Sequence, residues 1–568
     1  MFKRSIAGGQ SDLFNSIYHQ VGAKKSAELE DLKGWHNIFF KYVTNQIDES
    51  IFSPLFSKNM GRSNSSIRQL LSMMILKEGN NWTDEQLFEE VGFNIKVMLA
   101  LGQSNFKDAA PSPSTYYKFR SRVVAYDAEH GTDLFGDFFV SHAQGIAKSF
   151  GIKGQKVRMD SKLFSSNIAK STRLQLIVKS LRNWLKQKSE QELTVLSKAS
   201  QEVLARVAKH HAERFTFRMA KKEEKEWLEK CGLVIKEIVD KQDDDTGLLA
   251  RILSEQYKII EVPSDKTEDT KEEKIELKDA AEISGNTIQS PHDLEATYRR
   301  KQNGNLVQSV RGYASNITET CSEDNDFNII TSVQTESATH SDDQFFQQAI
   351  ETSQVVLGDE KIEEAATDGS YHSPANVAYA KGTNGTAPFT FYTQAIQGTD
   401  GNFDYEWLEG KELKVTDKRT GKTYLATKTS NGKYRIKLPK GYHYILPKTI
   451  ENYFLRKEIE KNKVYITTIR ANVEGTIHQV FHTLNGRKSK YRGLKKNHFY
   501  VILRSIWANF RRLAKYVGKT LLKALIIAFF ALKWLQAHHS AWWRNFRIQS
   551  KIPKIDQIKF GSNFKPIF

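Results

Sequence analysis

The side chains best suited to chemistry lie in one stretch, Tyr465–Arg492, which reads YITTIRANVEGTIHQVFHTLNGRKSKYR. Its β-branched opening favours an extended run that passes into a helix. On that helix Arg470, Glu474 and His478 are four residues apart, so they share one face. Glu474 is a candidate metal ligand. Arg470 would pair with this acid or with a phosphate, and His478 would contact a phosphate or hydrogen-bond the acid.

Two aspartates follow short predicted strands. Asp160 ends a strand expected over Lys156–Met159, and Asp368 follows a short apolar step within Glu363–Ser373. A carboxylate at a strand end projects from the sheet edge into a cleft, where α/β sheets bind ligands. A lone aspartate at such a position is more often a turn or capping residue, so spacing alone does not select these two among the 66 acidic residues.

Three converging carboxylates would suit phosphodiester chemistry. Cleavage and strand transfer need an activated water or 3′-hydroxyl and a stabilised leaving oxygen, which two Mg²⁺ ions about 3.5–4 Å apart supply together. Mg²⁺ is a hard cation that takes few carboxylates and keeps several waters. Three acids are therefore enough to hold the two ions.

The elements around the acids predict a mixed α/β sheet with insertions. Strand signals occur at Gly304–Glu319 and Phe327–Glu336, and a helix capped by Ser341 follows them. Residues 171–262 have helical periodicity and form a helical excursion whose charges read as solvated faces. Residues 263–294 are polar and acidic and read as a linker. Residues 391–446 form a β-rich insertion with turn signals at Thr420-Gly421 and Asn431-Gly432.

The first 145 residues predict a helical domain that binds DNA. Thr83 and Gln86 form a capping box at one helix start. A later helix opens with the basic residues Lys118, Arg120 and Arg122 among aromatic ones, which suits docking on DNA. The alternative is a helical bundle with a solvated basic face.

The segment after the third acid predicts a second basic surface. Leu503, Ile506, Phe510 and Leu513 form a core-facing stripe. The stripe leaves five cations mostly outward, for DNA-backbone contact or for solvent: Lys495, Lys496, Arg504, Arg511 and Lys515.

Composition favours a polyanionic partner. The formal charge is +18 and the isoelectric point is about 9.4, which favours nucleic acid over an unspecialised basic protein. Cys231 and Cys321 are the only cysteines, so a disulfide framework is excluded and a reducing compartment is expected. In Leu521–Leu535 the uncharged run is nine residues, too short to span a bilayer, so we expect no membrane partner.

Six ordered segments resemble the DDE-class transposases of bacterial insertion sequences. They begin with GRSNSSIRQLLSMMILKEGNNWTDEQL, followed by PSPSTYYKFRSRV, and continue with MDSKLFSSNIAKSTR, SPHDLEATYRRKQNGNLVQSVRGYASNITE, ATDGSYHSPAN and IRANVEGTIHQVFHTLNGRKSKYRGLKKNHFYVILRSIWANFRRLAKY. The resemblance implies an α/β ribonuclease H-like catalytic core with a β-rich insertion, plus a helical N-terminal domain and a helical excursion. The core would comprise 150–170, 295–390 and 447–517, followed by a basic-aromatic tail at 518–568.

The resemblance also implies the activity and its residues. Asp160, Asp368 and Glu474 would be catalytic and would hold two Mg²⁺ ions, with Mn²⁺ tolerated. The partners would be the terminal inverted repeats and target DNA, bound as double strands by a homo-oligomer in the bacterial cytoplasm, at the nucleoid. One departure is Phe481, where related proteins often carry Lys. Lys488 and Lys490 would replace it as phosphate contacts, or the role would be absent. Arg492 is also expected to contact DNA.

Three functions follow as hypotheses. The first is a transposase that binds element ends, cleaves DNA with metal ions and transfers strands. The second is a transposase-derived DNA-binding protein without catalysis, and the third is a basic membrane-surface protein that uses residues 521–543.

Overall fold

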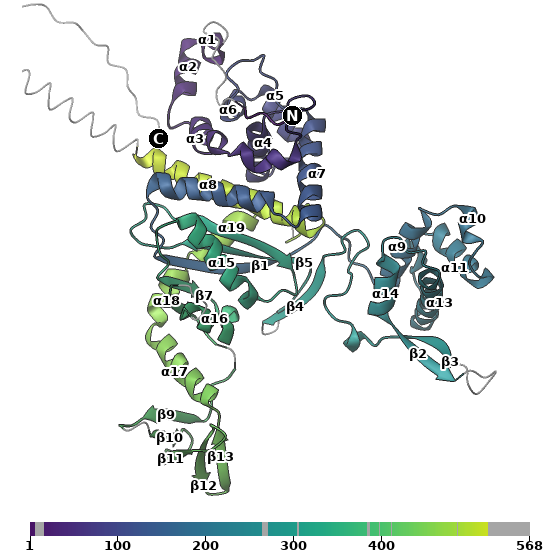
Figure 1. Ribbon diagram of the computed structural model, residues 1–568, viewed down its shortest axis with the longest axis vertical. Coiled ribbons are helices and arrows are strands. Elements are labelled where there is room, and N and C mark those ends of the chain that lie inside the picture. Colours follow the sequence, from purple (N-terminus) through teal and green to yellow (C-terminus); the bar gives the residue numbers. More distant parts are fainter. Residues whose placement is uncertain are drawn as a thin grey trace, which may run out of the picture.

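A computed structural model describes residues 1–5, 16–263, 271–303, 306–382, 387–396, 398–409, 412–484 and 487–520 (Figure 1). The tail predicted at 518–568 and the apolar run Leu521–Leu535 lie almost wholly outside these residues. Within the described part of the chain, no helix has the length and apolar character needed to cross a membrane.

In the described part of the chain, eight α-helices precede the first strand. They are α1 (Ile17–Gln20), α2 (Ala23–Glu30), α3 (Trp35–Tyr42), α4 (Ile67–Asn80), α5 (Asp84–Phe93), α6 (Ile95–Ala100), α7 (Pro113–His130) and α8 (Leu134–Phe150), with 3₁₀ turns η1 (Thr44–Gln46) and η2 (Glu49–Leu55). The capping box predicted at Thr83 is confirmed, because its side chain accepts from Gln86 N and the Gln86 side chain accepts from Thr83 N. One hydrophobic core joins helices α3–α8 to Phe164 and Ile317 of the sheet, so these helices are not packed as a separate domain, while α1 and α2 pack in a small cluster with Met98 and Leu99 of α6.

A six-stranded mixed sheet forms the centre of the molecule. Its strands are β1 (Lys156–Ser165), β4 (Thr297–Asn303), β5 (Leu306–Thr320), β6 (Ile330–Ser337), β7 (Glu364–Thr367) and β8 (Thr390–Thr393), in the order β4-β5-β1-β7-β8 with β6 also paired to β5. The pairs β1–β5, β4–β5 and β5–β6 are antiparallel, whereas β1–β7 and β7–β8 are parallel.

Strand β1 is longer than predicted. It was expected to end at Met159, but it continues to Ser165 because β5 pairs with it throughout, from Val157↔Thr320 to Ser165↔Gly312. Asp160 therefore lies in the middle of the strand and not at its end.

Helices cover both faces of the sheet. Val157, Met159 and Leu163 of β1 pack with α15 (Asp342–Leu357). Side chains alternate along a strand, so Arg158, Asp160 and Phe164 point to the other face. Around that face lie α18 (Lys463–Arg470), α19 (Val473–Phe481) and a C-terminal helix described over 494–520. The short η4 (Gly369–Tyr371) and α16 (Pro374–Ala380) follow β7.

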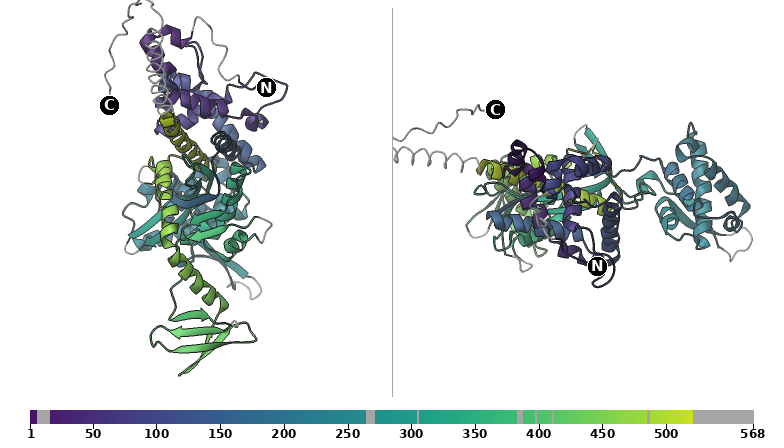
Figure 2. Two further views of the ribbon diagram at one scale, coloured as in Figure 1. Left: turned by 90° about the vertical axis from the view of Figure 1, so that its left-hand side faces the viewer. Right: turned by 90° about the horizontal axis from the view of Figure 1, so that it is seen from above.

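The β-rich insertion is a separate antiparallel sheet. It contains β9 (Phe403–Trp407), β10 (Leu413–Asp417), β11 (Thr423–Lys428), β12 (Tyr434–Leu438) and β13 (Gly441–Ile445). Both predicted hairpins are present, and Gly421 (φ 68°) and Gly432 (φ 73°) supply their left-handed turn positions. Helix α17 (Pro447–Lys461) connects this sheet to α18 at the end of the molecule opposite the N-terminal helices (Figure 2).

The helical excursion forms a unit with its own hydrophobic core. It comprises α9 (Arg173–Leu185), α10 (Glu190–Leu193), α11 (Lys198–Lys209), α12 (Ala212–Phe215), α13 (Lys221–Asp240) and α14 (Leu248–Gln256), with β2 (Tyr257–Pro263), β3 (Lys271–Leu277) and η3 (Ala280–Glu282). Figure 1 and the right-hand view of Figure 2 show this unit beside the sheet.

The linker prediction for 263–294 is wrong over much of that segment. Residues Lys271–Leu277 form strand β3 and pair antiparallel with β2, from Tyr257↔Leu277 to Pro263↔Lys271. The acidic composition concealed this strand, because Glu276 stands opposite Lys258 and such cross-strand charge pairs stabilise a hairpin. Ile288 then packs into the core of the helical unit.

Candidate active site

Asp160 and Asp368 lie side by side because two parallel strands position them. In the register of the two strands, Arg158 of β1 pairs with Ala366 of β7, and Asp160 and Asp368 each lie two residues farther along the chain. Strand alternation places Asp160 on the α18–α19 face of β1. Asp368 directly follows β7, where its carboxylate accepts a hydrogen bond from Ser370 N at 2.8 Å and caps η4.

The site raises the pKa of Asp160 to about 6. Burial is the largest cause, because it disfavours the charged carboxylate; the Arg470 guanidinium opposes this shift, and the negative charge of Asp368 adds to it. The effect of Asp368 on Asp160 is consistent with the register of β1 and β7, which brings the two residues close together. Their oxygens are the hard donors that suit Mg²⁺.

Arg470 contacts the first acid. Its Nη2 lies 3.6 Å from Asp160 Oδ2, and the side chains of the two residues are 13% and 16% exposed. Arg470 Nη1 also donates to Gln394 Oε1, beyond the end of β8. The sequence predicted that Arg470 would pair either with Glu474 or with a phosphate. The structure adds Asp160 as a third partner.

Glu474 does not share an uninterrupted helix with Arg470. The β-branched run predicted as extended is helical in α18, and Ala471-Asn472 separates α18 from α19. This interruption changes the expected common face: Arg470 is half-buried beside Asp160, whereas Glu474 and His478 are exposed. Among the described residues, no three His, Cys, Asp or Glu side chains form a group that could hold a metal ion. The fit to two Mg²⁺ ions is thus limited to a pair of acids.

Sequence reasoning missed a third acid near the pair. Asp342 is 3% exposed, accepts a hydrogen bond from Ser161 Oγ at 2.7 Å, and lies 3.8 Å from Lys301 Nζ. Its charge helps to raise the pKa of Asp160. The sequence signal was ambiguous, because an acid in the first turn after Ser341 is what a helix N-terminus favours for its own stability.

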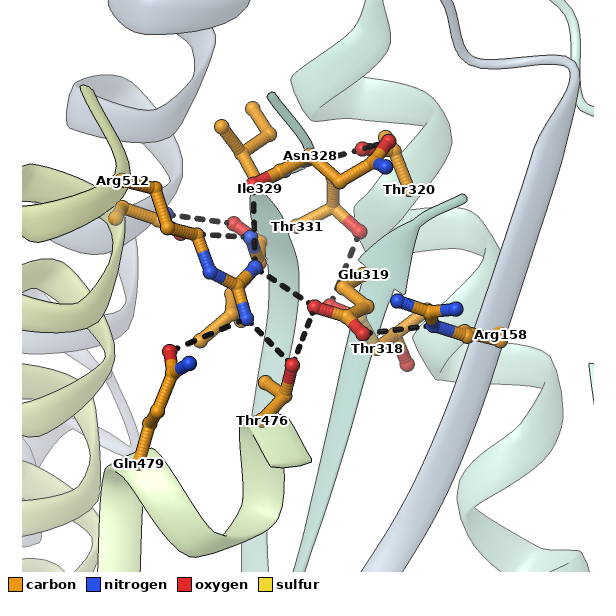
Figure 3. A network of polar contacts seen from close by, with 12 residues as sticks. Arg158, Thr318, Glu319, Thr320, Asn328, Ile329, Thr331, Thr476, Gln479 and Arg512 are labelled. Atoms are coloured by element: carbon orange, nitrogen blue, oxygen red, sulfur yellow. Dashed lines mark hydrogen bonds and ion pairs between the residues drawn. The ribbon is translucent and has the colours of Figure 1, made fainter. Parts of the chain in front are cut away.

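A buried ionic network holds the interruption between α18 and α19 against the sheet (Figure 3). Glu319 of β5 is fully buried, and its carboxylate lies 2.7 Å from both Arg158 Nε and Arg512 Nη1. Thr476 of α19 donates to the same carboxylate at 2.7 Å, and Arg158 Nη1 donates to Ile469 O of α18 at 2.7 Å. Glu319 thereby links β1, β5, both helices and the C-terminal helix.

Two predicted DNA contacts are corrected. Arg504 is 1% exposed, and its guanidinium donates to carbonyls at the ends of α4 and α19, those of Glu78, Gly79, Gln479 and Val480. Helix ends leave such carbonyls unpaired, so Arg504 satisfies them and does not face outward. Lys495 is half-buried and donates to Thr132 O at 3.0 Å.

The other predicted contacts differ in environment. Arg120 is half-buried and stacks on the rings of Tyr116, Tyr117 and Tyr491, which ties α7 to the segment after α19. Arg122 donates to Leu55 O at 3.3 Å, and together with Lys118 it lines a surface hollow of about 910 Å³. The exposed cations are Lys118, Arg122, Lys488, Lys490, Arg492, Lys496, Arg511 and Lys515.

The comparisons with known proteins bear on the N-terminal helices. No curated protein and no solved structure matches the chain. A family model described as Transposase domain (DUF772) matches residues 27–122, which span the second half of α2, all of α3 to α6 and the first part of α7. Residues 27–122 therefore carry the signature of a transposase domain, and this match supports a transposase role for the chain.

Proposed function

We propose that this protein is a DDE-class DNA transposase of the insertion-sequence type, which cleaves element ends and joins them to target DNA. The observation that carries the proposal is that Asp160 of β1 and Asp368, directly after β7, each stand two residues beyond the Arg158↔Ala366 pair of these parallel strands, with Arg470 beside Asp160. The transposase-domain match over residues 27–122 supports the same function from a different part of the chain.

We assign the core to the ribonuclease H-like class. The support is a mixed sheet with one acid in its first strand, a second acid directly after β7, and a helix pair that carries Arg470 and Glu474 across the same face. The helical unit between β1 and β4, and the β9–β13 sheet between β8 and α17, are insertions in this core.

The residues of the site would have distinct roles. Asp160 and Asp368 would hold Mg²⁺, and Glu474 is the candidate for a third ligand. When bound, the metal would polarise the scissile phosphate and activate the attacking oxygen. Arg470 holds Asp160 in place and could also donate a hydrogen bond to a ligand. Its Nε is buried and has no hydrogen-bond partner among the described residues. A phosphate oxygen would satisfy that donor.

The partner would be double-stranded DNA, first as terminal inverted repeats and then as target, bound by more than one copy of the chain in the bacterial cytoplasm. The exposed cations of α7, of the segment after α19 and of the C-terminal helix provide the charge for phosphate contact.

The test uses purified protein, Mg²⁺ and DNA that carries the element's ends. We expect nicking or cleavage at the ends, and its loss in Asp160→Asn, Asp368→Asn and Glu474→Gln with DNA binding retained. Glu460→Gln on α17 is the matched control, because Glu460 is an exposed acid paired with Lys463. Full cleavage by any of the three acid variants would remove that acid from the site.

The second candidate is a transposase-derived DNA-binding protein without catalysis. The observation in its favour is that Glu474 is exposed and does not join the two aspartates in a metal-binding group of the described residues. Isothermal titration distinguishes the two candidates: DNA binding with neither Mg²⁺ binding nor cleavage would establish the second.

A further inference from the structure

The helical unit has a strongly basic corner that the catalytic proposal does not use. We define the α11–α13 corner as Arg206–Lys225, which includes the end of α11, all of α12 and the start of α13. This segment contains seven Lys or Arg and three Glu, a net charge of +4 in 20 residues. Folding brings further positive charge to it, because Arg182 of α9 donates to the carbonyls of Val207, Ala208 and His210.

The acids of the corner are largely engaged within the unit. Glu213 pairs with Lys179 at 2.7 Å, and Glu223 lies 3.9 Å from Arg206. The remaining cations are exposed and have no ion pair within the described residues: Lys209, Arg214, Arg218, Lys221, Lys222 and Lys225. The concentration of positive charge also affects His210. Its pKa is lowered, first by burial and second by the neighbouring Arg and Lys side chains.

An aromatic side chain projects from the centre of the corner. Phe217 is 69% exposed in the loop between α12 and α13, and the Arg218 guanidinium lies 5.1 Å from the centre of its ring. Arg218 has φ 54°, a left-handed conformation that side chains other than glycine rarely adopt. Strain of this kind recurs at functional sites, where the surrounding structure maintains it.

The start of α13 adds charge where a helix disfavours it. Lys221 and Lys222 occupy the first two positions of this 20-residue helix, at the positive end of its dipole. Glu223 and Glu224 of the same turn favour the dipole, but neither lysine has an ion pair among the described residues. The two lysine charges are thus available to a negatively charged partner.

We propose that the α11–α13 corner binds the phosphate backbone of double-stranded DNA at a distance from the catalytic aspartates. Basic residues would neutralise phosphates, and Phe217 would pack against the sugar-phosphate edge. A membrane surface fits less well as the partner. Among the described residues of this corner, Phe217 is the only large apolar side chain that is exposed, which is too little apolar surface for insertion into a lipid layer. The inference rests on the proposed function in one respect, that the polyanion is DNA.

The binding test compares two charge reversals of equal size in the full-length chain. Lys221→Glu with Lys222→Glu alters the corner, whereas Lys198→Glu with Lys274→Glu alters exposed cations elsewhere on the same unit. Anisotropy of a short labelled duplex of arbitrary sequence is measured over a salt series. We expect the corner variant to bind DNA about tenfold more weakly than the parent near 0.1 M salt. The slope of log affinity against log salt concentration should fall by the equivalent of about two phosphate contacts. The control variant should differ little from the parent.

A photo-crosslink gives a second, independent readout. Benzoylphenylalanine in place of Phe217 should crosslink the duplex, whereas the same residue in place of Leu233, which is 59% exposed on α13, should not. Equal affinities of the two charge variants, or a crosslink from position 217 to protein or lipid in place of DNA, would overturn the inference. Those results would leave the catalytic proposal standing, whereas absence of DNA binding by the parent protein would remove both.

Discussion

Arg470 Nη2 lies 3.6 Å from Asp160 Oδ2, so a residue of the last third of the chain neutralises a carboxylate of the first strand. Burial and Asp368 both favour the protonated form of Asp160, and Arg470 is the largest influence in the opposite direction. Arg470 is the last residue of α18, so the contact joins the end of that helix to β1. It is therefore both an electrostatic and a positional element of the site.

Loss of the Arg470 charge should raise the pKa of Asp160 above about 6. Arg470→Gln removes the cation that favours the carboxylate, whereas Arg470→Lys retains it. Carbon-13 NMR of labelled aspartate in the metal-free protein measures the titration. We expect the pKa of Asp160 to shift upward in the Gln variant and by a smaller amount in the Lys variant. An unchanged pKa in both variants would show that Arg470 does not interact with Asp160 in solution.

Glu319 should be among the most destabilising single positions to neutralise. Glu319→Gln leaves Arg158 and Arg512 without their shared carboxylate in a buried environment, which costs about 3–5 kcal/mol. Chemical denaturation measures the loss, with Glu460→Gln as the exposed control. A change below about 0.5 kcal/mol would show that the network does not hold α18 and α19 to the sheet.

Arg504 and Lys496 should separate stability from DNA affinity. Arg504→Ala removes the donor to four helix-end carbonyls and should lower the free energy of unfolding by about 2–4 kcal/mol. Lys496→Ala removes an exposed cation and should leave stability within about 0.5 kcal/mol while weakening DNA binding. Thermal denaturation and duplex anisotropy of both variants check the pair, and the reverse pattern would contradict the burial of Arg504.

His142 should make the fold less stable in acid. Burial lowers its pKa from 6.5 to about 4 in the folded protein, while Nε2 interacts with Tyr42 O at 3.2 Å. The unfolded chain therefore binds the proton more readily between these values, so stability falls as pH decreases from about 6.5 to about 4. At about pH 4 the resulting loss in the free energy of unfolding is about 3 kcal/mol relative to neutral pH.

The His142 contribution appears as a difference between two proteins. His142→Gln cannot take up this proton, so its unfolding free energy should vary less with pH than that of the parent over the same interval. Parallel slopes of the two proteins between pH 4 and 6.5 would show that His142 titrates normally in the folded state.

Local patterns in the sequence determined the features whose signals lie within a few residues. The capping box at Thr83 and the turns at Gly421 and Gly432 are present as predicted, because caps and tight turns depend on neighbouring backbone groups. The resemblance to a transposase family located Asp160 and Asp368, and the transposase-domain match over residues 27–122 is consistent with it.

Tertiary structure decided what depends on distant partners. The acidic strand β3 exists because β2 pairs with it, and the β-branched residues of α18 are helical because Ile466 and Ile469 are buried there. Arg504 is internal because the carbonyl ends of two other helices meet it. Burial and long-range pairing outweigh local propensity at each of these positions. The sequence could therefore indicate Asp160 and Asp368, but only the tertiary structure placed Arg470 beside Asp160.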